Sequence, residues 1–550
     1  MIKKTISEIL EETTSMFPDN DALVYNDKNL RMSYYEFNDY CDSLAKGLIA
    51  LGINKGDKIA VWAYNIPEWV FLQFASAKIG AILVTVNTYY KSFELEYLLK
   101  QSDSKALFLT SGFKDVDYIK MVYTILPDLE EKNIIDIQSN KFPFLKKIIF
   151  FGDKKYPSLI NYKELISLGK DVSDKNLSKI KNLLNCNDTI NMQYTSGTTG
   201  FPKGVMLSHF NIINNAYYVG KNMGLTYLDR MCIPVPFFHC FGCVLSTLNC
   251  VVHGSTMVPV DIFHPEKVLK IVDNEKCTVL QGVPTMFISE LNHPNFDDYD
   301  LSSLRTGIMA GSSCPIEVMV NTISKMNLKE ITICYGLTET SPVLTQTKRN
   351  DPISKRVETV GKPLPNIKVK IVDPTNGKEL SHNSPGELIA KGYSVMKGYY
   401  KMDNETKQVI RDGWLYTKDL AKVDEDGYFS ILGRIDDMII RGGENVYPRE
   451  IEEFLFTNEK IQDVSIVGVP SKKYGEEICA FIRLNDDYKL TVDEIKEFCK
   501  EGISRFKTPK YIIFTDTFPM TASGKIKKND LRKIAINKLD LNNQNTYNGG

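Results

Sequence analysis

A stretch rich in hydroxyls and glycines, residues 194–205, has the composition of an anion-binding loop. It reads Y-T-S-G-T-T-G-F-P-K-G-V and follows a β-favouring run, Thr189 to Tyr194. Glycines let a loop take left-handed backbone angles and bring its N–H groups close to a ligand. Backbone amides, hydroxyls and one lysine together form a cradle suited to phosphate. Its members are Thr195, Ser196, Gly197, Thr198, Thr199, Gly200 and Lys203.

The spacing of Gly197 and Lys203 matches part of the Walker-type loop, G-x-x-x-x-G-K-[ST]. Pro202 stands where that loop has its second glycine, and Gly204 stands where it has the hydroxyl that binds Mg²⁺. We therefore expect the stretch to hold phosphate in a different manner. The alternative is a surface turn without a ligand, but such turns seldom carry a lysine directly behind a strand.

A second segment, Tyr335 to Thr340, reads Y-G-L-T-E-T after the strand-like run Ile331 to Cys334. Tyr335 offers a flat face on which a nucleotide base can stack. Thr338 can donate a hydrogen bond to phosphate, and Glu339 is a hard oxygen ligand suited to Mg²⁺. The segment therefore combines the groups that a metal-bound nucleotide needs.

Two further segments place polar groups where strands are expected to end. Ala310 to Ser313 reads A-G-S-S, and a glycine at a strand end permits close approach of a flat ring. Trp414 to Leu420 reads W-L-Y-T-K-D-L, and a carboxylate at a strand end, here Asp419, is suited to both ribose hydroxyls. Taken singly, the first segment favours a simple βα turn, and a lone aspartate in the second is usually a helix cap or a solvated charge.

The last two segments lie near the C-terminus. Gly433 to Pro448 reads G-R-I-D-D-M-I-I-R-G-G-E-N-V-Y-P, which by itself could be a β-hairpin with a charged turn. Pro519 to Lys527 reads P-M-T-A-S-G-K-I-K and places Lys525 after a Ser-Gly turn. Most such lysines are solvated surface charges, so only the position of Lys525 relative to the other motifs can indicate a functional role.

Aromatic residues surround His239 in Pro236 to Gly242, which reads P-F-F-H-C-F-G. A histidine in such a run is more often a hydrogen-bonded core residue than a functional one. A zinc site is a sharper alternative, because Cys240-x-x-Cys243 and Cys250-x-x-His253 have the pair spacing of zinc ligands. Only six residues separate the pairs, and their apolar surroundings favour core helix spacing instead.

Taken in order, these seven segments resemble the motifs of the adenylate-forming superfamily, which includes acyl-CoA synthetases, luciferases and peptide-synthetase adenylation domains. The resemblance covers nearly the whole chain and is closest to medium- and long-chain fatty acid–CoA ligases. It implies an α/β fold with a large N-terminal multi-subdomain part and a small mobile α+β C-terminal domain. It also implies that ATP activates a fatty acid to acyl-AMP with release of pyrophosphate, and that coenzyme A then takes the acyl group. Mg²⁺ is the implied metal.

The resemblance assigns roles to individual residues. The implied catalytic residues are Lys525, Glu339, Thr338 and His239, and Glu339 also binds the metal. The implied ATP- or AMP-binding residues are Thr195, Ser196, Gly197, Thr198, Thr199, Gly200, Lys203, Gly311, Ser312, Tyr335, Gly336, Asp419, Arg434 and Lys525. Asp436 is the implied hinge, Gly442 and Gly443 the thiol tunnel, and Phe238, His239 and Gly311 the acyl pocket.

The elements that must position these residues begin as alternating strands and helices. Strands are predicted at Ala22 to Tyr25, Lys58 to Ala63 and Ala81 to Val86, and helices at Pro67 to Gly80 and after Ser33. Glu36, three positions after Ser33, completes a capping box. This alternation predicts βαβ units on a mainly parallel sheet.

Three regions are expected: a large domain over 1–435, a small domain over 436–539, and a disordered tail over 540–550. In the small domain we predict helices at Arg449 to Phe456 and Thr491 to Glu501, and strands at Val464 to Val469 and Glu477 to Leu484. The tail is polar and rich in asparagine. A chain of 550 residues agrees with more than one domain.

The composition argues against binding of nucleic acid and favours a reducing compartment. The net charge of −1 argues against a nucleic-acid footprint. The 11 cysteines lie mostly in apolar runs, which favours free thiols in a reducing compartment. No apolar run reaches the roughly 18 to 20 residues that span a bilayer. We expect a cytoplasmic monomer or homodimer, with peripheral membrane contact left open.

Phe237, Phe238, Phe241 and the apolar run Val244 to Val252 predict an apolar acyl site. Some long-chain members of the resembled family have a tryptophan gate where this chain has Cys243, so chain length stays open. The rival functions are a ligase that loads an acyl carrier protein or activates an aryl acid, a phosphate-transferring NTPase, a luciferase-like oxygenase and a nucleotide sensor. Pyrophosphate and AMP as products would separate adenylation from the NTPase, which gives ADP and phosphate.

Overall fold

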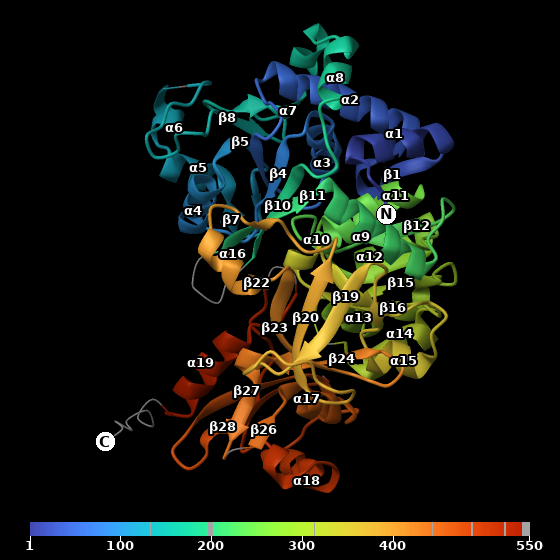
Figure 1. Ribbon diagram of the computed structural model, residues 1–550, viewed down its shortest axis with the longest axis vertical. Helices are drawn as coiled ribbons and strands as arrows, with labels where there is room; N and C mark the ends of the chain where they lie inside the picture. Colours follow the sequence, from blue (N-terminus) through green and yellow to red (C-terminus); the bar gives the residue numbers. More distant parts are fainter. Residues whose placement is uncertain are drawn as a thin grey trace.

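The computed structural model describes residues 1–541 except 133, 196–201, 313, 443, 486–487 and 522–523 (Figure 1). Two large, mostly parallel sheets form its N-terminal part. The first has eight strands in the order β21-β11-β10-β4-β3-β5-β8-β9. Their bounds are β3 Lys58–Trp62, β4 Ile82–Thr85, β5 Ser104–Leu109, β8 Lys147–Phe150, β9 Ile160–Asn161, β10 Thr189–Thr195, β11 Lys203–Ser208 and β21 Gly398–Tyr399.

The second sheet has nine strands in the order β18-β17-β16-β15-β14-β12-β13-β1-β2. Its strands are β1 Asp21–Tyr25, β2 Leu30–Ser33, β12 Arg230–Ile233, β13 Thr256–Pro259, β14 Val279–Gly282, β15 Thr306–Met309, β16 Thr332–Gly336, β17 Val343–Gln346 and β18 Lys362–Pro363. A two-stranded ribbon, β6 Gly112–Phe113 with β7 Val116–Asp117, lies apart from both sheets.

Helices accompany these sheets. With the first sheet and the N-terminus belong α1 Ile6–Met16, α2 Tyr34–Ala50, α3 Pro67–Ile79, α4 Ser92–Ser102, α5 Tyr118–Ile125, α6 Asp128–Lys132, α7 Tyr162–Leu168 and α8 Asp174–Lys181. Later in the chain follow α9 His209–Met223, α10 Cys240–Gly242, α11 Asn249–His253, α12 Pro265–Glu275, α13 Pro284–Leu291, α14 Ile316–Lys325, α15 Ile353–Glu358 and α16 Asp403–Val409. Among the described residues no helix is both long and apolar enough to cross a bilayer.

Local signals in the N-terminal sequence predicted the elements well. Ser33 Oγ accepts from the Glu36 N–H at 3.2 Å and Glu36 Oε2 accepts from the Ser33 N–H at 2.8 Å, which confirms the capping box of α2. Helix α3 ends at Gly80 with φ +72°, as expected of a helix-terminating glycine. The strands β3 and β4 are parallel neighbours, as the βαβ pattern predicted.

The alternation of strands and helices predicted one mainly parallel sheet for the first strands of the chain. The strand β1 instead pairs with β2 and β13 in the other large sheet. The Cα partner of Leu23 is Met257, 234 positions away, so no local pattern could place it. Parallel pairing across such distances is decided by the packing of the whole domain.

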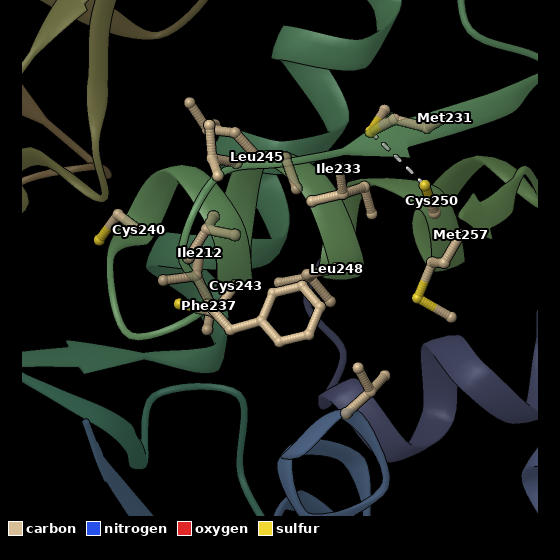
Figure 2. Packing of buried hydrophobic residues seen from close by; sticks show 14 of the residues in the cluster. Ile212, Met231, Ile233, Phe237, Cys240, Cys243, Leu245, Leu248, Cys250 and Met257 are labelled. Atoms are coloured by element: carbon tan, nitrogen blue, oxygen red, sulfur yellow. Dashed lines mark hydrogen bonds between the residues drawn. The ribbon is translucent and has the colours of Figure 1, made fainter. Parts of the chain in front are cut away.

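A π-helical segment, Cys243–Leu248, interrupts the helical run between α10 and α11. Buried glutamines contact its backbone: Gln73 Nε2 donates to the Cys243 carbonyl at 2.8 Å, and Gln281 Nε2 donates to the Leu245 carbonyl at 2.9 Å. Such wide turns are rare, and each one needs partners for its displaced backbone groups. Figure 2 shows that the apolar side chains of this segment belong to one buried cluster.

A third sheet leads from the large part of the chain toward the C-terminal part. It has five strands: β19 Ile367–Val372, β20 Gly386–Gly392, β22 Ile410–Arg411, β23 Trp414–Val423 and β24 Phe429–Arg434. A fourth sheet follows, with β25 Ile439–Arg441, β26 Glu444–Val446, β27 Ile461–Ser471, β28 Gly475–Leu484 and β29 Tyr511–Phe514. Helices α17 Pro448–Phe456, α18 Val492–Gly502 and α19 Lys528–Lys538 accompany the fourth sheet at the end of the molecule opposite α8 (Figure 1).

The fourth sheet has hydrophobic clusters of its own, such as the one that joins Ile439, Ile451 and Ile466. The helices and strands predicted for residues 449–501 all lie where the pattern placed them. The disordered tail was expected to begin at residue 540, which is too early. Leu541 is only 4% exposed and packs beside α19, so folded structure extends at least to this residue. Residues 542–550, the rest of that tail, lie outside the described residues.

Candidate functional site

Strands β10 and β11 form a hairpin whose register pairs Thr195 with Lys203. The loop between them contains the predicted cradle residues Ser196, Gly197, Thr198, Thr199 and Gly200, which lie outside the described residues. Its two ends are fixed, because β10 also pairs with β4 and β11 also pairs with β21. Lys203 therefore begins a strand in the interior of the first sheet, and its ammonium lies 5.1 Å from the centroid of the Tyr399 ring.

Glu339 lies in a single turn, Thr338–Thr340, directly after β16. The side chain of Thr340 fixes this turn, because its hydroxyl accepts from the Leu337 N–H at 2.9 Å and donates to the Pro342 carbonyl at 2.7 Å. At Gly336 any Cβ would lie 1.8 Å from that same carbonyl oxygen, so only glycine fits. The Y-G-L-T-E-T motif is thus a compact turn that presents Thr338 and Glu339 after a strand.

Tyr399 joins the two motifs just described. Its hydroxyl donates to Glu339 Oε1 at 2.8 Å, and its ring lies beneath the Lys203 ammonium. Burial and the negative charge of Glu339 raise the pKa of Tyr399, so the hydroxyl keeps its proton and acts as a donor. Sequence reasoning missed this residue, because its strand β21 is only two residues long and carries no local signal of a site.

Asp419 was expected at a strand end, and that expectation was wrong. It lies inside β23, with Arg434 as its register partner on β24. The preceding residue, Lys418, has φ +59°, and the ladder is irregular on both sides of this position. A local distortion of the strand thus replaces a strand end.

The Asp419 carboxylate has two protein partners. Tyr335 donates its hydroxyl to Oδ2 at 2.6 Å, and Arg434 Nη1 lies 3.3 Å from Oδ1. Burial raises the pKa of Asp419, while Arg434, Tyr335 and the nearby Lys525 oppose the rise. The sequence named all four residues, and the structure brings them together.

Lys525 reaches this site from the C-terminal part. The Thr285 hydroxyl, at the start of α13, donates to the Gly524 carbonyl at 3.3 Å and so docks the turn before Lys525. The Lys525 Cε atom lies 3.8 Å from where a Cβ on Gly311 would stand. Gly311 itself has φ +94°, which disfavours any side chain, and it is exposed together with Ser312.

The side chains of Lys525 and His239 both have lowered pKa values at this site. Desolvation lowers the pKa of Lys525 and Arg434 adds to this, whereas Asp419 and Glu339 raise it. Burial and the Lys525 charge lower the pKa of His239 to about 3, so the imidazole is neutral at physiological pH. His239 Nε2 is buried without a hydrogen-bond partner among the described residues, so this nitrogen is available to a bound ligand or water.

Phe238 packs against the imidazole of His239, with 4.4 Å between ring centroids and the ring planes tilted by 42°. Its neighbour Phe237 points elsewhere: it is 1% exposed and packs on Trp69, 5.3 Å between centroids, within the buried cluster of Figure 2. Phe237 is therefore a core residue, whereas the role of Phe238 in an acyl pocket stays a prediction.

The residues assigned to domain motion and to the thiol lie on the C-terminal side. Asp436 is exposed in the turn Ile435–Asp437, and its carboxylate lies 3.9 Å from the Lys418 ammonium. Gly442, with φ +62°, directly follows β25, which pairs with β26, and its N–H donates to the Tyr474 carbonyl at 2.8 Å. Gly443 lies outside the described residues. The interpretation of this segment as a β-hairpin is thus compatible with a functional role of Gly442.

The cysteine and histidine residues whose spacing suggested a zinc site make separate contacts in the hydrophobic core. His253 Nε2 hydrogen-bonds the Tyr217 carbonyl at 3.2 Å, while Cys250 contacts Met231 at 3.7 Å and Cys243 accepts from Gln193 at 3.0 Å. Within the described ranges no three His, Cys, Asp or Glu side chains are grouped so as to hold a metal ion. A single carboxylate such as Glu339 is what Mg²⁺ uses when substrate phosphates and water complete its shell.

Comparison with known proteins agrees with this geometry. Residues 10–400 match the family model described as AMP-binding enzyme, and residues 450–525 match the AMP-binding enzyme C-terminal domain. The putative acyl-CoA synthetase YngI of Bacillus subtilis is 54% identical, over 98% of this chain and 99% of its own. The mitochondrial medium-chain acyl-CoA ligase ACSF2 of Homo sapiens is 40% identical, over 98% of this chain and 88% of its own.

Solved structures of enzymes with 26% sequence identity share the fold. ATP-bound MatB from Rhodopseudomonas palustris superimposes with a TM-score of 0.82 at 26% identity, covering 97% of this chain and 99% of its own. The o-succinylbenzoate CoA synthetase MenE of Bacillus subtilis, in complex with its acyl-adenylate OSB-AMP, gives 0.77 at 26% identity with the same coverage. The fold predicted from the motifs is therefore confirmed, and the chain belongs to the AMP-binding enzyme family, among its acyl-CoA synthetases.

Proposed function

We propose that this enzyme is a fatty acid–CoA ligase that forms acyl-AMP from ATP and a medium- to long-chain acid and then transfers the acyl group to coenzyme A. The observation that carries the proposal is the docking of the Lys525 turn, from the C-terminal part, beside Thr285 and Gly311. The charges of Asp419, Glu339 and Arg434 act on the lysine there. A cation held there can follow the charge that develops on a transferring phosphoryl group.

The substrate class rests on the relatives and on the chemistry beside His239. Several relatives named medium-chain acyl-CoA ligase are 38% to 40% identical over 98% of this chain. A neutral His239 beside Phe238 presents a polar nitrogen at an otherwise apolar place, which suits an acid with an unsubstituted hydrocarbon tail. We assign Phe238, His239 and Gly311 to the acyl end of the site.

In the first half-reaction a carboxylate oxygen of the acid attacks the α-phosphorus of ATP, the bond to the bridging oxygen breaks, and pyrophosphate leaves. Tyr335 stacks on adenine, Asp419 and Arg434 hold the ribose, and the 195–200 loop with Lys203 and Thr338 holds the phosphates. Mg²⁺, bound at Glu339, would neutralise phosphate charge. Gly311, Ser312 and Gly336 provide the space that the nucleotide needs, and Lys525 contacts the forming acyl–phosphate linkage.

In the second half-reaction the sulfur of coenzyme A attacks the acyl carbon, AMP leaves, and the thiol proton passes to solvent. We place the domain boundary at Asp436, with residues 1–435 in the large domain and residues from 436 to at least 541 in the small one. Rotation about Asp436 would withdraw Lys525 and bring the Gly442–Gly443 turn to the site. The exposure of Asp436 and of Gly442 supports this assignment.

We further propose a cytoplasmic location, which the free cysteines favour; those at positions 41, 232, 243 and 277 are buried thiols. The proposal includes a monomer or homodimer and leaves peripheral membrane contact open. None of these assignments affects the chemistry of the site.

Product analysis tests the proposed function. Purified enzyme is incubated with ATP, coenzyme A and saturated fatty acids of graded length, and pyrophosphate and AMP are measured. Release of both with medium or long acids supports the proposal, whereas ADP and phosphate would refute it. Replacing coenzyme A by a holo acyl carrier protein identifies the acceptor: turnover with the carrier protein alone would overturn the assignment of coenzyme A.

A further inference from the structure

Tyr399 lies between two groups that the adenylation chemistry uses. Its hydroxyl donates to the Glu339 carboxylate at 2.8 Å, and its ring centroid lies 5.1 Å from the Lys203 ammonium. One side chain thus contacts both the carboxylate assigned to the metal and the cation at the end of the phosphate loop. A tyrosine can do this because its hydroxyl and its ring face are separate interaction surfaces.

The backbone around Tyr399 fastens the same two motifs. The Met396 N–H donates to the Glu339 carbonyl at 2.8 Å, and the Tyr400 N–H donates to the Gly204 carbonyl at 2.8 Å. Strand β21 pairs with β11 in the register Val205 to Tyr399. The segment 396–400 is therefore a brace between the Glu339 turn and the β10–β11 hairpin, and Tyr399 is the side chain that points to the charged groups of both.

The hydrogen bond to Oε1 limits how the Glu339 carboxylate can turn. A carboxylate has about four lone-pair sites, so one bond from Tyr399 restricts its rotation and still leaves oxygen sites for a cation. A carboxylate without such a partner would sample several rotamers, and each binding event would have to order it.

We propose that Tyr399 is a positioning residue for the adenylation half-reaction: its hydroxyl orients Glu339 toward the divalent cation, and its ring holds Lys203 at the base of the phosphate loop. The proposal rests on the proposed function, since it assigns the cation and ATP to this site. It adds a residue that acts through Glu339 and Lys203 rather than by touching the reacting atoms.

The substitution Tyr399→Phe tests the hydroxyl alone, because the ring stays beside Lys203. Tyr400→Phe is the matched control: it is the next residue on the chain, and its hydroxyl donates to Asp103 at 2.8 Å instead. Thermal stabilisation by ATP is measured at graded Mg²⁺ concentrations, which reports binding without turnover. Pyrophosphate exchange and thioester formation from supplied acyl-AMP are measured in parallel.

For Tyr399→Phe we expect the Mg²⁺ concentration at half-maximal ATP stabilisation to rise about tenfold, the order that a hydrogen bond to a charged group contributes. Pyrophosphate exchange should show the same shift, while thioester formation from acyl-AMP and the melting temperature without ligand stay near wild type. Tyr400→Phe should leave the Mg²⁺ titration unchanged. An unchanged titration in Tyr399→Phe, or an equal shift in Tyr400→Phe, would overturn the proposal.

A double-mutant cycle isolates the path through Glu339. Glu339→Gln should shift the Mg²⁺ titration strongly, and adding Tyr399→Phe should shift it no further, because the oriented carboxylate is already gone. Shifts that simply add would show that Tyr399 acts elsewhere and overturn the proposal.

The substitution Tyr399→Leu tests the ring. It should weaken ATP binding beyond Tyr399→Phe, since the ring beneath Lys203 is lost as well. Equal ATP affinity in the two variants would overturn the part of the proposal that concerns Lys203.

Failure of the proposed function gives a different result. If wild-type enzyme released pyrophosphate with none of the fatty acids, the substrate assignment would fall. The Mg²⁺ and ATP binding titrations would still decide the role of Tyr399, because they need no acid.

Discussion

The hydroxyl of Tyr335 donates to the carboxylate of Asp419 at 2.6 Å and so joins two strands of different sheets, β16 and β23. Arg434, the register partner of Asp419, adds an ion pair at 3.3 Å. The buried carboxylate is therefore oriented by a neutral donor and a cation before any ligand arrives. Such preorganisation lowers the entropy that binding must remove.

Asp419→Asn should weaken ATP binding about 100-fold, because two hydrogen bonds from ribose to a charged acceptor would be lost or reversed. We expect the KM for ATP to carry most of the effect, and steady-state kinetics at saturating fatty acid measures it. Tyr335→Phe keeps the stacking face and should cost about tenfold or less. Equal KM values for ATP in Asp419→Asn and wild type would contradict the ribose assignment.

Lys525→Ala should reduce acyl-adenylate formation by about 100- to 1,000-fold, the usual effect of removing one charge-stabilising donor from a transition state. Thioester formation from supplied acyl-AMP should remain near wild type, because the C-terminal part would present a different surface in that step. Single-turnover assays of each half-reaction measure this. Asp436→Pro should show the reverse pattern, and equal losses in both steps for either variant would refute the two-state assignment.

Stability should fall in acid because histidines are buried in the neutral form. Burial lowers the pKa of His209 from 6.5 to about 3, and its Nδ1 accepts from the Ile6 N–H at 3.1 Å. The unfolded chain therefore binds a proton at higher pH than the folded chain does. The free energy of unfolding should decrease as pH falls below about 6.5, by about 1.4 kcal/mol per pH unit for each such histidine.

The variant His209→Gln checks this linkage, because glutamine can still accept from the Ile6 N–H but does not titrate. Urea unfolding at a series of pH values gives the free energy of unfolding as a function of pH. Between about pH 6 and pH 4 the slope of this curve should be smaller than in wild type by the equivalent of about one bound proton. His239 and His253, whose pKa values are also lowered by burial, should retain their share of the slope. A curve parallel to wild type would contradict the prediction.

Gln73→Leu should destabilise the protein by about 1 to 3 kcal/mol, because it removes two buried hydrogen bonds to the π-helical segment. Gln73 donates to the Cys243 carbonyl at 2.8 Å and accepts from the Thr247 hydroxyl at 2.7 Å. The free energy of unfolding from urea titration is the measurement. Gln408→Leu, at an exposed position of α16, is the control and should change stability by less than about 0.5 kcal/mol. An equal effect of the two substitutions would show that the buried hydrogen bonds do not matter.

The sequence by itself determined the family, the order of the motifs and most helix and strand positions. These depend on neighbours a few residues apart: the capping box of Ser33, the helix end at Gly80 and the turn built on Gly336 are all local. Short-range rules of backbone conformation are sufficient for them, and the motifs carry their chemistry in the residue types themselves.

Tertiary structure alone decided which distant segments meet. Strand β1 lies in the second sheet because Leu23 pairs with Met257, and Asp419 lies within a distorted strand rather than at its end. Tyr399 reaches Glu339 across 60 positions of sequence, which no local pattern records. Such contacts form only when whole sheets pack, because the chain must close long loops before these pairs can interact.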